Sequence, residues 1–222
     1  MRKVIAALLF AALMAVCLAA CAQSRQTNGE PEQIPPQAAF DITPTPNQDS
    51  DHQKDVGSEP EAVVRPDMSI SSAGVKDGFL EDRFGMRGSD KSNGVPTLSP
   101  PVSITDAPQD TVCFAVIMID PDSKPLCGYE WVHWLAVGIP SPDIEENASI
   151  NSSADICQGK NDFGTIGYGG PTPPDKPHTY IITVYALDGT PGLAGGFSLS
   201  ELKDAMEGHI LAEASLSAVY NN

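Results

Sequence analysis

The chain has 222 residues, of which 13 are basic and 29 are acidic, so its formal net charge at pH 7 is −16. Nucleic-acid binding needs Lys and Arg to neutralise phosphates, so this balance argues against a nucleic-acid partner and against broad docking on anionic lipids. It does not exclude a small anion pocket, because local hydrogen-bond donors decide what such a pocket holds.

The first residues have the order of an export signal. Arg2 and Lys3 precede the apolar run 4–18, and small residues then stand directly before Cys21. The apolar run is shorter than the roughly 20 residues of a membrane-spanning helix. Leu-Ala-Ala-Cys resembles the lipobox of bacterial lipoproteins, whose signal is cut before a cysteine that becomes acylated. We therefore expect a signal peptide at 1–20 and a lipid anchor on Cys21; an uncleaved anchor or an ordinary signal peptide is the alternative.

The segment 21–67 is rich in Pro, Gln, Asn, Ser and Asp, and Phe40 is its only aromatic residue. Such a composition buries too little apolar surface to offset the entropy cost of ordering the chain. It predicts a disordered linker behind the lipidated cysteine. The remaining residues, 68–222, predict one domain of ordinary size, held by its anchor outside the cytoplasm and facing the periplasm or the exterior.

Three apolar runs predict the central strands of this domain. Thr111–Ile119 is apolar and β-branched on both faces, which is typical of a strand inside a sheet. Trp131–Ile139 is a second run, and Pro140 ends it. His178–Leu187 is the third, and an Asp-Gly turn follows it.

The C-terminal part predicts one helix and one strand. Ser198 and Glu201 form a capping box, in which each side chain satisfies a free backbone N–H group at a helix start. Apolar residues then repeat at helical spacing, at Leu199, Leu202, Met206 and Ile210. Ser215–Tyr220 alternates polar and apolar residues. The whole pattern predicts a mainly β fold, a compact β-sandwich with a few peripheral helices, including one near the C-terminus.

Two polar residues interrupt the apolar runs. Asp120 directly follows the first strand, where its carboxylate either faces a cleft or caps the turn, and Asp122 is interpreted as a cap. His133 lies inside the second strand, and a buried imidazole needs a hydrogen-bond partner. Asp120 is its natural partner, because the carboxylate would turn the second ring nitrogen outward. A core histidine with a purely structural role is the alternative.

The segment 167–174 is too rich in Gly and Pro for regular structure. Its glycines allow close approach of the backbone to a ligand, and successive amides there can form an anion-binding nest; a rigid surface loop is the alternative. His178 follows this loop directly, and we place His209 in the last helix as a structural residue. The chain has no Gly-x-x-x-x-Gly-Lys and no Gly-x-Ser-x-Gly motif.

The cysteines predict one disulfide and no metal site. Cys113 lies in an apolar run and is expected to be a buried thiol. Cys127 and Cys157 lie in loops that flank the expected pocket, and export permits a disulfide between them. The chain has no Cys-x-x-Cys and no close His-x-x-x-His, so we expect no metal and no cofactor.

Taken together, these segments resemble the phosphatidylethanolamine-binding protein family, in the bacterial branch often called Raf kinase inhibitor-like. The motifs come in the family's order between Ser69 and Tyr220. They are Asp120-Pro121-Asp122, Trp131, His133-Trp134, Gln158 to Gly164, Gly167 to Pro171, Pro177-His178 and Tyr180.

The resemblance implies a β-sandwich with a small surface pocket for phosphate-like or carboxylate-like groups. By that likeness the pocket is lined by Asp120, His133, Gly170, Pro171, His178 and Tyr180. The chain departs from the family pattern at Ser123-Lys124-Pro125 and at Gly138, where an asparagine is usual, so the rim of the pocket and its ligand stay open.

We therefore expect a membrane-tethered extracytoplasmic binding protein for a phosphate-like or phosphoethanolamine-like anion. Binding should weaken above neutral pH, as the imidazolium of His133 or His178 is lost. The alternatives are a protease inhibitor or another protein-interaction module, and, with less support, a hydrolase, because no nucleophile or metal motif is present. The natural ligand and the oligomeric state do not follow from the sequence.

Overall fold

The structure, a computed structural model, describes residues 67–151 and 156–222, which belong to one compact unit. The predicted signal peptide, the predicted lipidation site Cys21 and the predicted linker up to residue 66 lie outside the described residues. Among the helices that are described, none has the length and apolar character needed to cross a bilayer.

A seven-stranded sheet forms the centre of the fold, with the order β10-β8-β7-β11-β12-β3-β2. Neighbouring strands run antiparallel except β12 and β3, which run parallel. The strands are β2 (Val75–Lys76), β3 (Phe79–Leu80), β7 (Cys113–Asp120), β8 (Trp131–Ile139), β10 (Cys157–Gln158), β11 (His178–Leu187) and β12 (Ile210–Tyr220).

Shorter elements surround this sheet. A three-stranded sheet contains β1 (Ser69–Ser71), β6 (Val102–Thr105) and β9 (Asp143–Ile144), and a small hairpin contains β4 (Lys91–Ser92) and β5 (Val95–Pro96). The helical elements are η1 (Asp82–Phe84), η2 (Pro121–Ser123), α2 (Lys124–Cys127), α3 (Ala148–Asn151) and α4 (Leu199–Met206).

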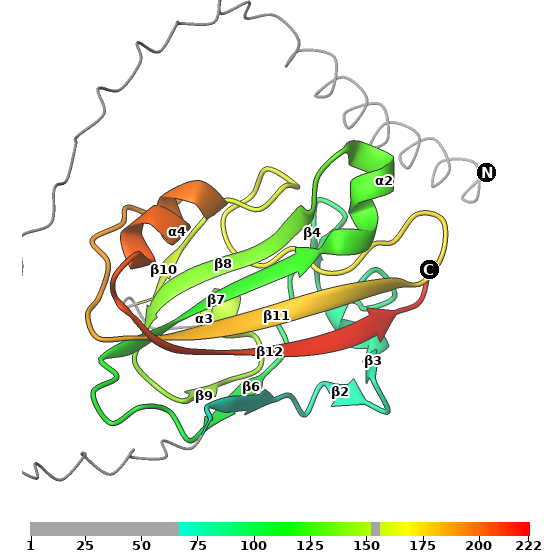
Figure 1. Cartoon of the computed structure of the whole chain (residues 1–222). Coiled ribbons are helices and arrows are strands. Elements are labelled where there is room, and N and C mark those ends of the chain that lie inside the picture. Colours follow the sequence, from blue (N-terminus) through cyan, green and yellow to red (C-terminus); the bar gives the residue numbers. More distant parts are fainter. Residues whose placement is uncertain (1–66, 152–155) are drawn as a thin grey trace, which may run out of the picture. The chain divides into compact units, whose positions relative to one another are not determined.

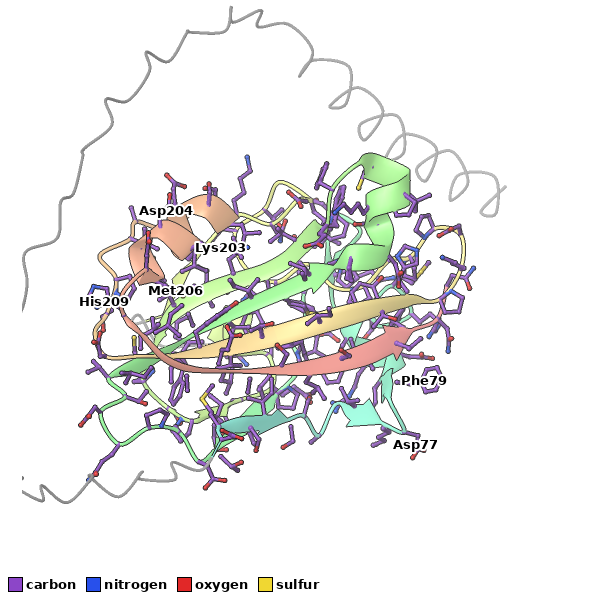
Figure 2. The ribbon with its side chains drawn as sticks, viewed as in Figure 1. Asp77, Phe79, Lys203, Asp204, Met206 and His209 are labelled. Carbon is purple, nitrogen blue, oxygen red and sulfur yellow. The ribbon has the colours of Figure 1, made fainter. Side chains whose placement is uncertain are left out.

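The large sheet buries both of its faces. One face packs against the three-stranded sheet, where Met118 and Trp134 share a core cluster with Ile104. On the opposite face, Leu202 and Met206 of α4 join a second cluster. Figure 1 shows α4 and the three-stranded sheet on opposite sides of the large sheet, and Figure 2 shows Met206 on the inner side of α4. Burying each such apolar side chain stabilises the fold by roughly 1.5–3 kcal/mol.

The structure confirms the mainly β sandwich and its central strands. β8 and β11 have the bounds that the sequence predicts, and β7 begins two residues later than predicted and ends one residue later. β7 pairs with β8 on one side and β11 on the other, and it is buried on both faces. Burial on both faces therefore explains the apolar and β-branched composition of β7, as predicted.

The predicted capping box is present at α4, where the Ser198 hydroxyl accepts from the Glu201 amide and the Glu201 carboxylate accepts from the Ser198 amide. The predicted end of the helix is wrong. The helix ends at Met206, because Gly208 takes a left-handed φ of 79°, and Ile210 begins β12. The helical spacing of Ile210 is a coincidence, and His209 lies in the turn.

The predicted disulfide is also wrong, because Cys127 and Cys157 are not bonded to each other. The thiol of Cys127 donates to the Ser123 carbonyl at the end of α2, whereas the thiol of Cys157 on β10 donates to the Leu193 carbonyl. Cys113 is buried, as expected.

Candidate functional site

A β-bulge places His133. Met118 of β7 pairs with Trp134 of β8 and Ile119 pairs with Val132, so His133 is an extra residue in β8. A bulge re-aims a side chain that strict alternation would send elsewhere. The His133 ring stands edge-on to the Tyr180 ring, with 5.1 Å between the ring centroids. The bulge therefore brings His133 to the sheet face that carries Trp134 and Tyr180.

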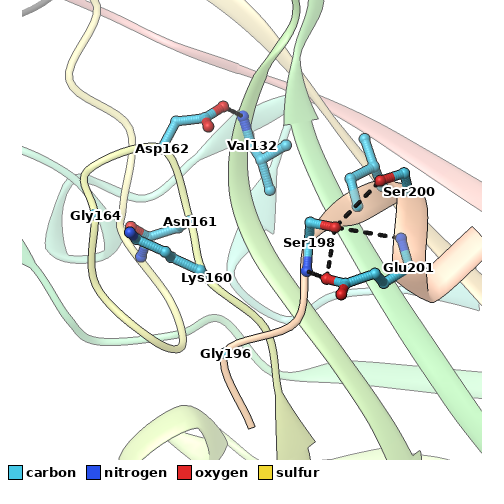
Figure 3. A pocket seen from close by; sticks show the side chains of 10 residues that line it. Val132, Lys160, Asn161, Asp162, Gly164, Gly196, Ser198, Ser200 and Glu201 are labelled. Atoms are coloured by element: carbon cyan, nitrogen blue, oxygen red, sulfur yellow. Dashed lines mark hydrogen bonds between the residues drawn. The ribbon is translucent and has the colours of Figure 1, made fainter. Parts of the chain in front are cut away.

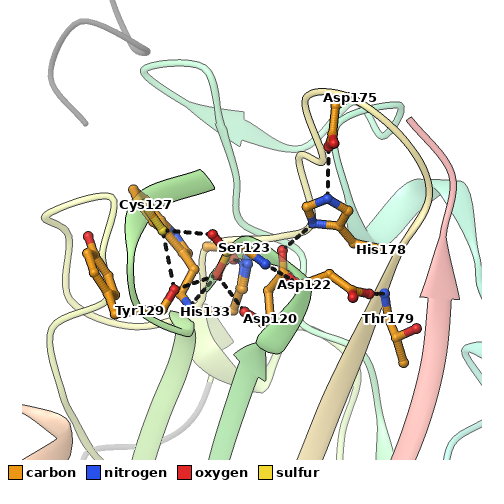
Figure 4. Close-up of polar contacts among 11 residues, drawn as sticks. Asp120, Asp122, Ser123, Cys127, Tyr129, His133, Asp175, His178 and Thr179 are labelled. Carbon is orange, nitrogen blue, oxygen red and sulfur yellow. Dashed lines mark hydrogen bonds and ion pairs between the residues drawn. The ribbon is translucent and has the colours of Figure 1, made fainter. Parts of the chain in front are cut away.

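Buried polar side chains meet at one end of the large sheet, where β7 ends and where β8 and β11 begin (Figure 4). Four of them are Asp120, His133, His178 and Tyr180, and each of these residues is 1 to 4% exposed. Asp175, from the loop before β11, joins them at the surface. We call these five residues the histidine cluster. The sequence predicted the first four together, and the structure brings them together.

Asp120 orients His178, not His133 as the sequence predicted. Oδ2 of Asp120 lies 2.7 Å from Nδ1 of His178, and Oδ1 accepts from the Ser123 amide at 3.2 Å. The cause is the strand order: β11 lies beside β7, and Ile181 pairs with Ile119, so the end of β7 meets the start of β11. Burial raises the pKa of Asp120, although the hydrogen bond from His178 opposes this shift. The carboxylate of Asp122 accepts from the Thr179 amide of β11 at 2.8 Å, so the residue that caps the turn is Asp120 and not Asp122 as predicted.

His133 is held by the backbone. Its Nδ1 lies 2.5 Å from the Gly169 carbonyl, which can only accept, so Nδ1 carries the hydrogen. Burial, reinforced by the nearby His178, lowers the pKa of His133 to about 4. The ring is neutral at pH 7, and its Nε2 is an acceptor with no hydrogen-bond partner among the described residues. Without a ligand, His133 is therefore not the imidazolium that the sequence analysis allowed at either histidine.

His178 contacts two carboxylates. Besides Asp120 at Nδ1, its Nε2 lies 2.9 Å from Oδ1 of Asp175. Ionised carboxylates only accept hydrogen bonds, so these contacts need a hydrogen on both ring nitrogens. His178 thus donates from both ring nitrogens. His133 differs, because it donates at Nδ1 and leaves an acceptor at Nε2. Asp175 was not predicted from the sequence, where its signal is an acid three residues before His178.

Tyr180 carries a polar atom whose hydrogen bonding is incomplete. Its hydroxyl is buried and makes no hydrogen bond of normal geometry with the described residues, although it lies close enough to interact with the Asp120 carboxylate. Burial and the nearby Asp120 carboxylate raise the pKa of Tyr180 well above its usual value, so the hydroxyl stays protonated. A buried hydroxyl without a hydrogen bond of normal geometry costs free energy, which makes this atom a candidate ligand contact.

The amides of the Gly-rich loop do not form the predicted anion nest. The Gly169 amide donates to the His133 carbonyl and the Gly170 amide to the Pro96 carbonyl, both at 2.9 Å. The Tyr168 amide donates to the Ser149 hydroxyl. Pro171 contributes its carbonyl, which accepts from the Met86 amide. The loop is a rigid support that fixes His133 through the Gly169 carbonyl.

Gly170→Ala tests this tight support. A Cβ at position 170 would stand 2.2 Å from the Phe84 carbonyl oxygen, and backbone cannot move aside cheaply. We expect a loss of roughly 1–3 kcal/mol in the free energy of unfolding, measured by urea denaturation. Gly189→Ala is the control, because a Cβ there meets nothing within 4 Å. Equal stability of the two variants would contradict the close packing.

A pocket of about 540 Å³ lies elsewhere, between the loop that carries Asp162 and the start of α4 (Figure 3). Its polar lining includes Lys160, Asp162, Ser198 and Glu201, and none of the six predicted ligand residues lines it. Ser198 and Glu201 already bond to each other in the capping box. Among the described residues, no three His, Cys, Asp or Glu side chains lie together in a way that could hold a metal ion.

Comparison with known families gives one match over most of the chain. The family described as phosphatidylethanolamine-binding protein matches residues 70–221. The protein YxkA of Bacillus subtilis is 38% identical over 153 residues, which are 62% of this chain and 91% of YxkA.

Two solved structures have similar folds. One is described as a putative phosphatidylethanolamine-binding protein homolog from Chlamydia trachomatis; it is 32% identical, has a TM-score of 0.60, and the match covers 70% of this chain and 98% of that protein. The other is YbcL of Escherichia coli, described as a member of the mammalian PEBP family. It is 28% identical, with a TM-score of 0.61 and coverage of 70% and 99%.

Proposed function

The chain belongs to the phosphatidylethanolamine-binding protein family, and from that membership we propose that it binds a small phosphate-like anion, free or as a phospholipid head group, at the histidine cluster. The observation that carries this proposal is the buried, protonated hydroxyl of Tyr180, which makes no hydrogen bond of normal geometry and lies beside the His133 ring. We propose a receptor rather than an enzyme, since the cluster lacks an activated nucleophile.

The cluster offers complementary groups to such a ligand. Nε2 of His178 and the hydroxyl of Tyr180 are donors suited to anionic oxygens, and Nε2 of His133 is an acceptor. A ligand that carries an anionic oxygen together with a hydroxyl or ammonium group satisfies all three. Monohydrogen phosphate and phosphoethanolamine both have this chemistry.

The expected affinity is modest. Hydrogen bonds to charged groups contribute roughly 1.5–3 kcal/mol each before the entropy costs of binding. Two such bonds place the dissociation constant of free phosphate between about millimolar and tens of micromolar.

His178→Gln should abolish most of this binding. Calorimetric titration with inorganic phosphate and with phosphoethanolamine should show binding to the wild type and a dissociation constant at least tenfold higher in the variant, because a hydrogen-bond donor to the anion is lost. His209→Gln is the control, since His209 also pairs with an aspartate but lies in the turn before β12, at the other end of β11. Tighter binding of phosphoethanolamine would favour a lipid head group as the source of the anion. If neither ligand gives a binding heat with the wild type at a saturating concentration, the proposed function is contradicted.

We also propose that the domain is tethered to a membrane on the extracytoplasmic side. The support is the export-type sequence that ends at Cys21. A Cys21→Ser variant of the full chain should leave the membrane fraction, because acyl chains supply the attachment at about 0.8 kcal/mol per buried methylene. Labelled fatty acid should be incorporated into the wild type and not into the variant. Membrane retention of an unlabelled wild type would contradict the lipid anchor.

A further inference from the structure

We propose that Asp175 is a built-in competitor at the histidine cluster: its carboxylate occupies the anion-binding nitrogen of His178, and a ligand anion must displace it. This inference rests on the proposed function, and it adds a residue that sets the affinity and the access of the site.

The first support is the contact itself. His178 is buried, and Asp120 engages its Nδ1, so Nε2 is the one ring nitrogen left for a ligand. Oδ1 of Asp175 stands 2.9 Å from that nitrogen, at a normal hydrogen-bonding distance for an anionic oxygen. The Asp175 carboxylate therefore has the charge and the acceptor geometry that the ligand needs.

The second support is the difference in burial across this contact. The His178 side chain is 1% exposed, whereas the Asp175 side chain is 45% exposed. Asp175 is thus the more exposed partner, and Figure 4 shows it on the side of the His178 ring that faces away from the strands. The half-exposed Asp175 side chain can rotate into water without any change in the core. Exposing Nε2 of His178 therefore costs little free energy.

The backbone of Asp175 is held in place independently of its carboxylate. The side-chain amide of Asn222 donates to the Asp175 backbone carbonyl at 3.2 Å. Arg87 in turn donates to the Asn221 carbonyl at 2.5 Å and stacks on the Tyr220 ring. These contacts keep the loop near His178 when the side chain turns away, so the competitor remains at a high local concentration.

The size of the effect follows from the exposure of the pair. A half-exposed ion pair contributes up to about 1 kcal/mol, because solvent screens it. The apparent affinity of a ligand falls by the fraction of molecules in which the site is open. Removing the competing carboxylate should therefore strengthen anion binding by about fivefold.

Asp175→Asn is the test, with inorganic phosphate and phosphoethanolamine as probes in calorimetric titrations of the folded protein. In Asp175→Asn, the dissociation constant of phosphate, if not of both probes, should fall by about fivefold relative to the wild type. Asp175→Glu should stay within about twofold of the wild type, since it keeps the carboxylate. Asp188→Asn is the charge-matched control: it also removes one negative charge and one aspartate–histidine contact, but at the other end of β11.

The outcomes separate the two proposals. Tighter binding by Asp175→Asn with no change in Asp188→Asn supports the competitor, and so does binding that appears only in Asp175→Asn. Equal affinities of the wild type and Asp175→Asn overturn the competitor and leave the anion site standing. An equal gain in Asp188→Asn overturns it as well, because general charge would then be the cause. Absence of binding in every variant overturns the proposed function and the competitor with it.

Discussion

Replacing Asp120 with alanine should lower the free energy of unfolding by roughly 3–5 kcal/mol, because one partner of a buried ion pair is removed while the other stays buried. Nδ1 of His178 then loses its acceptor. The Ser123 amide also loses the carboxylate that caps the start of η2, which costs about 1 kcal/mol of that total.

Urea denaturation of Asp120→Ala beside Asp122→Ala measures this effect under matched conditions. Asp122 accepts one amide hydrogen bond and pairs with no imidazole in the described structure, so its loss should cost about 1 kcal/mol. Asp120→Asn should fall between the two, because the amide keeps an acceptor oxygen. If Asp120→Ala and Asp122→Ala are equally stable, the ion pair with His178 is not the feature that holds this end of the sheet together.

Acid should destabilise the protein through His133, by about 3 kcal/mol between pH 6.5 and pH 4. In the folded chain the pKa of His133 is lowered to about 4, against a reference value of 6.5. Between these values the unfolded chain takes up a proton that the folded chain refuses. The stability linked to a neutral His133 is therefore complete above pH 6.5 and is lost as the pH falls towards 4. A shift of one pKa unit corresponds to about 1.4 kcal/mol.

The measurement is the difference in unfolding free energy between the wild type and His133→Gln as a function of pH. Glutamine does not titrate, and it can still donate to the Gly169 carbonyl. The raised pKa of Asp120 acts in the opposite direction, favouring the folded state at low pH, but Asp120 is present in both proteins and largely cancels. The difference should narrow or change sign as the pH falls. A pH-independent difference would mean that His133 titrates normally.

The two histidines therefore have different tasks. His133 is fixed by the loop carbonyl of Gly169 and offers a neutral acceptor, whereas His178 is fixed by Asp120 and offers a donor. Ring NMR signals should show a His133 resonance that does not titrate between about pH 5 and 8.

Local patterns predicted most of the fold. The bounds of β8 followed from an apolar run that ends at Pro140, and those of β11 from an apolar run that ends at an Asp-Gly turn. The capping box located α4. The end of that helix was missed because Ile210 fits both helical spacing and the strand that it begins. The parallel pairing of β12 with β3 involves residues far apart in the chain, which no local pattern specifies.

Four of the six predicted ligand residues lie together, but the hydrogen bonds among them were not predicted correctly. The family motifs named Asp120, His133, His178 and Tyr180, and these side chains do lie together. Which histidine faces Asp120 depends on the strand order and on the bulge at His133. A bulge is one extra residue in the pairing of two strands, and it leaves no mark on the sequence of either strand alone.

The loop amides were misjudged for a related reason. Glycines allow a backbone to approach a ligand, but they equally allow it to approach another part of the protein. Gly170 uses this freedom to lie against the Phe84 carbonyl, and its amide bonds to Pro96. Asp175 was overlooked because an acid in a Pro-rich loop is ordinary turn chemistry.

A crystal structure of the described domain with phosphoethanolamine tests the central claim most directly. The account predicts phosphate oxygens within hydrogen-bonding distance of Nε2 of His178 and of the Tyr180 hydroxyl, with the Asp175 carboxylate turned towards solvent. Density for the ligand only at another place, such as the pocket beside α4, with Asp175 still bonded to His178 at saturating ligand, would contradict it.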